Sequence, residues 1–448
     1  MLVANRGEIA LRVVRACSEL GLRSVAVYSS ADEDALHVRN ADEAVCIGPP
    51  RALDSYLNAE AIVQAALRSG ADAVHPGYGF LAENAAFAHA CREADLIFVG
   101  PSPDAIEAMG DKAVARQLAG RSGAPTIPGS DGAASLAEAL ELSGEVGYPV
   151  LVKAAAGGGG RGIRVARDAE ELQTVFEQAA LEAGAAFGDS ALYVEKLLTA
   201  ARHVEVQVLG DSQGNIVHLF ERECSLQRRR QKLIEESPSP ALDAVTRAAM
   251  TEAALRVARA VDYESAGTVE FLLDERGAFY FIEMNTRIQV EHPVTEMVTG
   301  IDLVAEQLRI AAGGEMPFRQ EELVQRGAAI EVRVNAEDPL HGFMPSPGEI
   351  TAFRPPEGPG IRVDTAAFAG YRVPPFYDSL IAKLIVCAAA RREAIALAER
   401  ALEAFEVQGI ATTIPFSLEL LADEAVRAGA YDVGLVERRL AESVRMPS

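Results

Sequence analysis

Five polar side chains alternate along one short segment, in a pattern that could form a reactive site. Residues 283–291 read EMNTRIQVE and follow the apolar run 277–282. If the backbone is extended there, side chains at every second position share one face. That face would carry Glu283, Asn285, Arg287, Gln289 and Glu291. Because polar groups are costly beside a buried strand unless they have partners, the alternation predicts a functional site.

A further carboxylate lies in the apolar run that precedes this segment. Residues 268–273 read TVEFLL, and the turn signal DERG at 274–277 predicts a hairpin that brings Glu270 close to Glu283. Two carboxylates about 4 Å apart repel by about 4 kcal/mol at the effective dielectric of a protein surface. They therefore need a cation or a shared proton. With Asn285 they form an oxygen set suited to Mg²⁺ or Mn²⁺. A solvated edge strand is the alternative, which the apolar neighbours disfavour.

A glycine-rich loop indicates a second ligand. The expected strand 148–153 ends in Lys153 and leads into GGGGRG at 157–162, followed by the expected strand 163–166. Glycines at this density allow backbone N–H groups to surround a polyphosphate. The loop contains no GxxxxGK[ST] and joins strand to strand, so neither common nucleotide signature fits. We expect a flap over a nucleotide with Lys153 as a phosphate ligand. The alternative is a floppy surface loop.

Two further features leave more than one interpretation open. Four positive charges fall within residues 228–232 of an acidic chain, either as a solvated face or as an anion site. Arg333 lies in the apolar strand AIEVRVN (329–335), where a positive charge needs a partner. That partner could be Glu331, Glu337 or an anionic substrate.

The elements that must position these residues alternate at first between strand and helix. This order predicts a parallel sheet with helices on its faces, at about 1–108, and sites at the carboxyl ends of its strands. The segments 5–8 and 75–80 are therefore site candidates or simple turns. The expected strands are 2–5, 24–28, 44–47, 71–75 and 96–99, and the expected helices are 8–20, 57–69 and 83–93.

Two further units are expected, which makes the fold class α/β, or α+β over the whole chain. The second unit holds the glycine loop, and the third begins at about 327. The expected strands are 191–195, 329–334, 349–353 and 380–387, and the expected helices are 168–185, 391–406 and 433–443.

Composition excludes several classes of protein. The chain has 448 residues, a net charge of −23 and 49% hydrophobic residues, so we expect two or three subdomains and no nucleic-acid or membrane partner. The five cysteines form no CxxC pair, which predicts free thiols in a reducing compartment. No apolar run reaches transmembrane length and the first residues lack a signal-peptide pattern. We expect a cytoplasmic protein.

Seven motifs, in this order, make the whole chain resemble biotin carboxylase, the ATP-grasp component of acetyl-CoA and related acyl-CoA carboxylases. They are ANRGEIA (4–10), HPGYGFLAEN (75–84), MGDK (109–112), GGGGRG (157–162), RHVEVQVL (202–209), RECSLQRR (222–229) and EMNTRIQVEHPVTE (283–296). The resemblance implies an ATP-grasp fold in three domains. These are a Rossmann-like parallel-sheet domain at 1–108, an ATP-grasp domain at 109–326 with a mobile lid at about 127–196, and a C-terminal α+β domain at 327–448.

The resemblance also implies roles for individual residues. ATP would be bound by Lys112, Lys153, Gly158, Gly159, Gly160, Glu195, Lys196, Leu198, His203, Gln227, Arg230, Glu270 and Glu283. Mg²⁺ or Mn²⁺ would be held by Glu270, Glu283 and Asn285, and bicarbonate by Lys232, Arg287, Gln289 and Val290. Biotin would meet Tyr78 and Arg333. The implied catalytic residues are Lys232, Arg287, Glu291 as the base for bicarbonate and Arg333 as the stabiliser of the biotin enolate.

The implied reaction forms carboxyphosphate from ATP and bicarbonate, releases CO₂ and phosphate, and carboxylates the biotin ureido nitrogen. No Met-Lys-Met occurs in the chain, so biotin is expected on a separate biotin carboxyl carrier protein. Carboxyltransferase subunits would complete the acyl-CoA carboxylase, and the family suggests a homodimer.

Three features depart from the family pattern. Arg230 stands where a histidine is usual, Ala156 replaces a frequent glycine, and the first strand is a few residues short. The competing interpretations are another bicarbonate-using ATP-grasp ligase and an ATP-binding regulatory or scaffolding paralogue with little or no turnover. A dehydrogenase is excluded because the first turn lacks GxGxxG.

Overall fold

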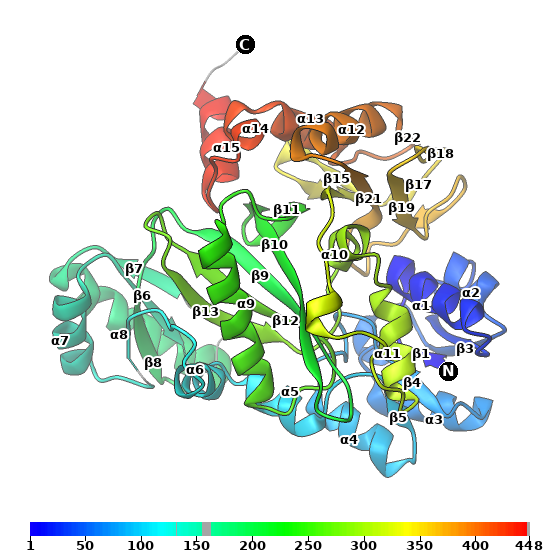
Figure 1. The fold of residues 1–448 in the computed structure, drawn as a ribbon, viewed down its shortest axis with the longest axis horizontal. Helices are drawn as coiled ribbons and strands as arrows, with labels where there is room; N and C mark the ends of the chain where they lie inside the picture. Colours follow the sequence, from blue (N-terminus) through cyan, green and yellow to red (C-terminus); the bar gives the residue numbers. More distant parts are fainter. Residues whose placement is uncertain (131, 155–162, 446–448) are drawn as a thin grey trace.

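The computed structural model describes residues 1–130, 132–154 and 163–445. Figure 1 shows these residues as an N-terminal unit in blue, a teal unit opposite it, a central green sheet, and an orange-to-red C-terminal region. The predicted glycine loop, with Ala156, Gly158, Gly159 and Gly160, lies outside the described residues.

The N-terminal unit is built on a parallel sheet, as predicted. Within the described residues its strand order is β3-β2-β1-β4-β5, and every pairing is parallel. The strands are β1 (Leu2–Val3), β2 (Val25–Ser29), β3 (Glu43–Gly48), β4 (Ala73–His75) and β5 (Ile97–Phe98). The helices are α1 (Gly7–Glu19), α2 (Leu36–Asn40), α3 (Ala59–Ser69), α4 (Ala85–Glu93) and α5 (Pro103–Gly110). Helix α1 buries Ile9, Val13 and Cys17, because residues three to four apart share one helix face.

The teal unit has a sheet and a core of its own. Its antiparallel strands lie in the order β7-β6-β8 in the described part of the chain, and apolar residues such as Leu172 pack against them. Its elements are α7 (Leu136–Val146), β6 (Val150–Ala154), β7 (Ile163–Ala166), α8 (Ala169–Phe187) and β8 (Leu192–Lys196), and α6 (Lys112–Arg121) leads into it.

The central sheet is antiparallel and continues across residue 327. Over the described ranges it contains eight strands in the order β13-β12-β9-β10-β11-β14-β21-β19. They are β9 (Arg202–Gly210), β10 (Ile216–Arg228), β11 (Gln231–Ser237), β12 (Ser265–Leu273), β13 (Phe279–Asn285), β14 (Ala328–Asn335), β19 (Ile361–Thr365) and β21 (Leu380–Ala388). The accompanying helices are α9 (Ala244–Arg259), α10 (His292–Thr299) and α11 (Leu303–Ala311). Because β11 pairs with β14, the third expected unit shares its sheet with the second.

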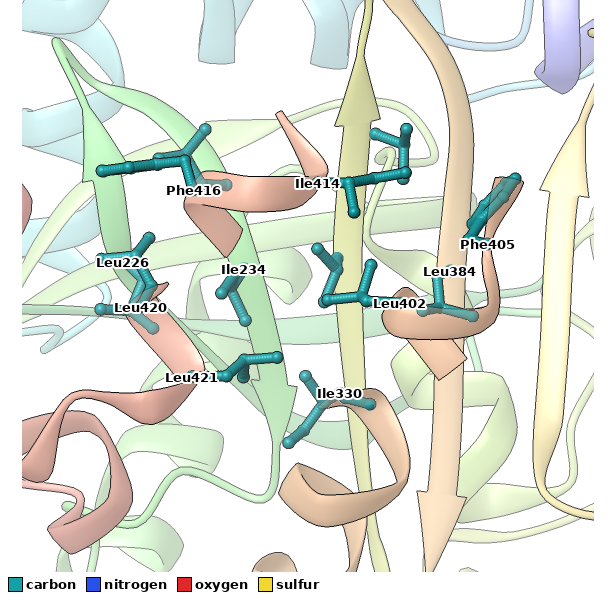
Figure 2. Close-up of a cluster of buried hydrophobic side chains, with 14 of the residues drawn as sticks. Leu226, Ile234, Ile330, Leu384, Leu402, Phe405, Ile414, Phe416, Leu420 and Leu421 are labelled. Carbon is teal, nitrogen blue, oxygen red and sulfur yellow. The ribbon is translucent and has the colours of Figure 1, made fainter. Parts of the chain in front are cut away.

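The C-terminal helices cover this shared sheet. Figure 2 shows Leu226 and Ile234 of the central strands packed with Ile330, Leu384 and Phe405 in one buried cluster. The helices are α12 (Arg391–Ala404), α13 (Ile414–Ala422), α14 (Glu424–Ala428) and α15 (Leu435–Arg445). The short strands are β15 (Glu337–Asp338), β16 (Met344–Pro345), β17 (Gly348–Glu349), β18 (Ala352–Arg354), β20 (Arg372–Val373) and β22 (Glu406–Gln408).

The prediction of one continuous strand was wrong. The segment 349–353 is divided between β17 and β18, because the chain changes partner there from β20 to β22. Each cysteine, all within the described residues, has a free thiol. Among the described helices, none is both long and apolar enough to cross a membrane.

Candidate active site

The hairpin of β12 and β13 places the paired carboxylates as predicted. Glu270 lies directly opposite Glu283, and Thr268 lies opposite Asn285. Asn285 Nδ2 donates a hydrogen bond to Glu270 Oε1 at 2.9 Å. Burial raises the pKa of Glu283, and the neighbouring charge of Glu270 raises it further. The pair therefore favours a positive group between its oxygens.

The extended backbone predicted through Glu291 is wrong. Strand β13 ends at Asn285, and α10 begins at His292 with Pro293 in its first turn. Proline is favoured at the start of a helix, because the missing N–H would have no partner there. The five polar side chains converge because the chain turns between Asn285 and His292, and they do not share a strand face.

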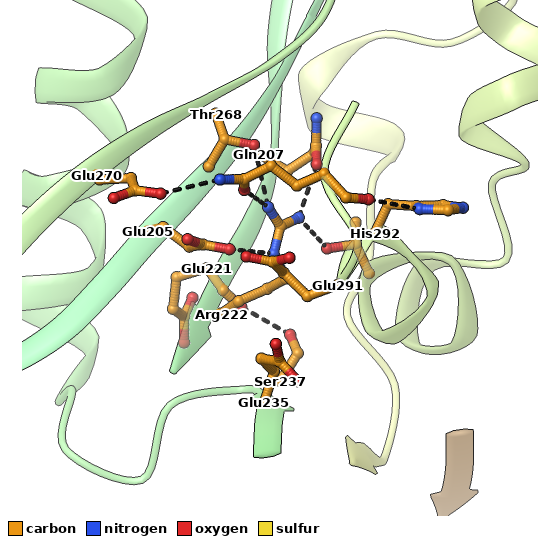
Figure 3. A network of polar contacts seen from close by, with 12 residues as sticks. Glu205, Gln207, Glu221, Arg222, Glu235, Ser237, Thr268, Glu270, Glu291 and His292 are labelled. Atoms are coloured by element: carbon orange, nitrogen blue, oxygen red, sulfur yellow. Dashed lines mark hydrogen bonds and ion pairs between the residues drawn. The ribbon is translucent and has the colours of Figure 1, made fainter. Parts of the chain in front are cut away.

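A buried guanidinium holds this turn against the sheet. Arg222 of β10 has no exposed side-chain surface, and it donates hydrogen bonds to five groups of the described chain (Figure 3). These are Glu205 Oε1 at 2.6 Å, Gln207 Oε1 at 2.6 Å, Thr295 Oγ1 at 3.0 Å, Thr268 Oγ1 at 3.0 Å and Gln289 Oε1 at 2.6 Å. Arg222 thus joins β9, β12, the turn and α10.

Two cations meet at the carboxylate of Glu291, which precedes α10. Lys232 Nζ contacts Glu291 Oε1 at 2.5 Å and Glu205 Oε2 at 2.6 Å. Arg333 Nη2 contacts Glu291 Oε2 at 2.9 Å. Burial alone would favour the neutral acid, but Lys232 and Arg333 outweigh it and hold the pKa of Glu291 well below its usual range. Glu291 is therefore a carboxylate.

Arg333 pairs with neither of the two glutamates that the sequence suggested as its partners. Arg333 Nε donates to Glu235 Oε1 at 2.6 Å, and its other bond goes to Glu291. Neither Glu331 nor Glu337 bonds to it within the described chain. The reason is topological, because β11 lies beside β14 and brings in Glu235, which the sequence separates from Arg333 by 98 positions.

The remaining residues of the turn are held individually. Arg287 Nε donates to Glu83 Oε2 at 2.9 Å and Nη2 to Asn285 Oδ1 at 3.0 Å. Gln289 lies between Arg222 and Glu270. Its Oε1 accepts a hydrogen bond from Arg222, and its Nε2 donates one to Glu270 Oε1 at 2.9 Å. The carbonyl of Val290 accepts a hydrogen bond from Lys383 Nζ at 2.8 Å.

A cleft opens between the teal unit and β13. Its lining includes Lys112, Lys153, Tyr193, Glu195 and Ile282. Lys153 forms an ion pair with Glu195, and Lys112 Nζ lies 3.7 Å from Glu283 Oε2. Two lysines in an apolar cleft, next to a carboxylate pair, suit a polyphosphate with a metal ion.

The other residues predicted to bind the nucleotide differ in how deeply they are buried. Lys196 Nζ donates to two backbone carbonyls of the teal unit, and His203 Nε2 lies 3.0 Å from Glu270 Oε2. Burial lowers the pKa of His203, but the charge of Glu270 outweighs this and raises it overall. Gln227 is buried and Leu198 half-buried, whereas Arg230 is exposed at the turn between β10 and β11.

Family models match three consecutive parts of the chain. Residues 1–106 match the biotin carboxylase N-terminal domain, 111–319 the ATP-binding domain of the carbamoyl-phosphate synthase L chain, and 331–438 the biotin carboxylase C-terminal domain. The chain belongs to the biotin carboxylase family. The predicted ATP-grasp fold and the class of ATP-dependent ligase are thereby confirmed.

Relatives are similar over nearly the whole chain. Biotin carboxylase 1 of Bacillus subtilis is 56% identical, with 98% of each chain covered. The biotin carboxylase of Pseudomonas aeruginosa is 52% identical, again with 98% of each chain covered. A solved biotin carboxylase domain dimer of 2-oxoglutarate carboxylase from Hydrogenobacter thermophilus, in complex with MgADP, ADP and bicarbonate, is 50% identical. The match covers 100% of this chain and 98% of that one, with a TM-score of 0.93.

Tyr78 follows β4 in the N-terminal unit, and the family resemblance predicts that it contacts biotin. Its hydroxyl donates to Glu8, whose Oε1 lies 3.2 Å from Lys383 Nζ. The amide of Asn5 donates to the carbonyls of Pro76 and Tyr78, both at 2.7 Å. The two segments left open as sites or turns, 5–8 and 75–80, therefore meet and hold one another.

Sequence reasoning missed the inner layer of this biotin carboxylase site. Glu205, Gln207, Arg222 and Lys383 received no role, although each is fully buried and hydrogen-bonded. The alternation in RHVEVQVL could have revealed the first two, because polar residues at every second position of a buried strand share one face. Arg222 carried no such signal.

Proposed function

We propose that this chain uses ATP and bicarbonate to carboxylate biotin through carboxyphosphate. The observation that carries the proposal is the Glu291 carboxylate, buried between Lys232 and Arg333 beside the paired carboxylates of β12 and β13. A base, two cations and a cation-binding pair in one pocket match the needs of phosphoryl transfer to a weak, anionic nucleophile.

ATP would occupy the cleft between the teal unit and β13. Lys112 and Lys153 would bind its phosphates, and the glycines at 158–160 would close over them. The adenine end would meet Glu195, Lys196 and Leu198, with His203 and Gln227 nearby. Arg230 is the weakest member of this set, because it is exposed in the hairpin turn.

The residues of the β12–β13 hairpin fit a divalent cation. Glu270 and Glu283 face one another, and the pKa of Glu283 is raised first by burial and further by the charge of Glu270. With the amide oxygen of Asn285 they offer hard oxygen ligands for Mg²⁺ or Mn²⁺. A bound cation would neutralise charge that develops on the phosphate oxygens.

Bicarbonate would bind beside Lys232, Arg287, Gln289 and the backbone of Val290. Glu291 would take its proton, the resulting carbonate oxygen would attack the γ-phosphorus, and ADP would leave. Carboxyphosphate would then break into CO₂ and phosphate. Phosphate would accept the N–H proton of biotin, and the ureido nitrogen would attack CO₂ while Arg333 stabilises the enolate oxygen.

The wider assignments are part of this proposal. Tyr78 and Arg333 would contact biotin, delivered by a biotin carboxyl carrier protein, and carboxyltransferase subunits would pass the carboxyl group to an acyl-CoA. The division at 108 and 326, a lid at about 127–196 and a homodimer are likewise proposed. A cytoplasmic location is supported by the free thiols.

The decisive experiment measures ADP release with Mg-ATP and bicarbonate, with and without free biotin, and ¹⁴C incorporation from labelled bicarbonate. We expect biotin to stimulate turnover and labelled carboxybiotin to form. Glu291→Gln should lower turnover by about 10²–10⁴-fold, the usual contribution of a general base, and leave ATP binding intact.

Glu306→Gln is the matched control, because Glu306 is also buried but lies on α11 and pairs with Arg309. It should leave turnover unchanged. Turnover that does not respond to biotin would favour another bicarbonate-using ligase. ATP binding without any turnover would favour the scaffolding paralogue.

A further inference from the structure

A second pair of buried carboxyl groups lies next to Arg333. Glu235 of β11 and Glu331 of β14 are directly opposite one another in the antiparallel ladder. The Cβ atoms of such cross-strand partners are about 5 Å apart on one face of the sheet. Both side chains are 0% exposed. Two ionised carboxylates at this separation, without solvent, would repel strongly.

The hydrogen bonds of the two groups are unequal. Glu235 Oε1 accepts from Arg333 Nε at 2.6 Å. Its Oε2 and both oxygens of Glu331 are buried and accept no hydrogen bond from any described residue. A buried charge without a partner costs several kcal/mol, so the group without a cation takes up a proton instead. That group is Glu331.

The surrounding charges support this assignment. Among the described residues, the charges that act most strongly on Glu331 are those of Lys383 of β21, Glu235 of β11, Arg333 of its own strand and Glu291 before α10. The ammonium of Lys383 is already engaged by the Val290 carbonyl, Glu8 and Asp364. Burial raises the pKa of Glu331 well above its usual range, and Lys383 only partly opposes this.

We propose that Glu331 is a protonated carboxylic acid that donates its hydrogen bond to Glu235 and so positions Arg333. The proton keeps a single negative charge beside the guanidinium. Arg333 then divides its bonds between Glu235 and Glu291, and its Nη1 has no hydrogen-bond partner in the described chain. This inference rests on the proposed function, in which Arg333 faces the biotin enolate. A second charge on Glu331 would draw the guanidinium toward the sheet and weaken its attraction for that anion.

The principal test compares the pH dependence of biotin-stimulated ADP release in the wild type, Glu331→Gln and Glu306→Gln. Glutamine keeps the shape of the neutral acid and can donate to Glu235, but it cannot ionise. We expect the wild type and Glu306→Gln to lose activity at alkaline pH, and Glu331→Gln to retain roughly tenfold more than either one pH unit above that inflection. The same alkaline inflection in all three proteins would overturn the proposal.

Two measurements on the resting protein are independent of turnover. The infrared carbonyl band of a protonated, buried carboxylic acid should be present in the wild type at neutral pH, and its intensity should fall in Glu331→Gln. Because the folded state keeps a proton on Glu331 that the unfolded state loses, the melting temperature of the wild type relative to that of Glu331→Gln should fall as pH rises above about 4.3, the unfolded glutamate value. If both expectations fail, Glu331 is ionised. If they hold while biotin has no effect on turnover, the proposed function fails and the protonated pair stands.

Discussion

At the scale of single residues, the site depends on a residue that touches no expected substrate. Arg222 is fully buried and joins Glu205, Gln207, Thr268, Thr295 and Gln289. Gln289 and Thr295 lie on either side of Glu291 in the sequence, so Arg222 fixes the segment that carries the proposed base. Arg222 thus pairs with Glu205 and also orders the turn.

Arg222→Lys should destabilise the protein by about 3–5 kcal/mol, because an ammonium cannot reach all five acceptors and leaves buried polar groups unpaired. Urea unfolding followed by circular dichroism measures this loss. Arg247→Lys is the control, since Arg247 pairs with the buried Glu221 but is itself 25% exposed, and it should cost under about 1.5 kcal/mol. Equal effects of the two substitutions would show that Arg222 has no special structural role.

Whether the sequence alone could predict a contact in the site depends on how far apart the two partners lie along the chain. Glu270 and Glu283 belong to neighbouring strands with a short turn, so local patterns were enough to pair them. Arg333 and Glu235 are 98 positions apart, and only the order of strands in the sheet brings them together. The period-two pattern after Asn285 misled because polar residues in an irregular turn can alternate by chance, and Pro293 was the better signal.

At the scale of elements, the N-terminal sheet positions Tyr78 through the ends of two adjacent strands. Asn5 follows β1 and donates to the carbonyls of Pro76 and Tyr78, which follow β4. Gly77 between them has φ +63°, and a Cβ there would lie 3.0 Å from Asn5 Nδ2. Sequence placed both strands correctly but could not decide between site and turn, because this contact depends on the parallel pairing of β1 with β4.

Asn5→Ala should raise the KM for free biotin by roughly 5–150-fold, because a lost pair of buried hydrogen bonds costs about 1–3 kcal/mol and releases the loop of Tyr78. The KM for ATP should change little. Steady-state kinetics with each substrate varied in turn would measure both. Asn58→Ala is the control, since Asn58 caps α3 in the same unit. A parallel rise in both KM values, or a rise in the control, would contradict a specific role for Asn5.

At the scale of the whole molecule, the chain has fewer independent parts than its motifs indicate. The central sheet runs from β13 to β19 without a break at residue 327, and the cluster in Figure 2 packs Ile234 from one side of that point with Ile330 and Leu384 from the other. The teal unit instead has its own sheet and its own buried cluster around Leu172. Composition and motif order indicated three units, but they carried no information about which strands pair across a boundary.

This architecture predicts two patterns of amide hydrogen exchange. Strands β14 and β21 should be protected together with β9 to β11, whereas β6 to β8 should open separately and become more protected when a nonhydrolysable ATP analogue binds. Two matched substitutions separate the cores, because each removes a buried aliphatic side chain at a cost of about 2–5 kcal/mol. Ile330→Ala should speed exchange on both sides of residue 327, and Leu172→Ala should speed it in β6 to β8 alone. If Ile330→Ala instead speeds exchange only after residue 327, the shared sheet divides into two cooperative units. The predicted C-terminal domain would then be a separate folding unit, even though its strands continue the central sheet.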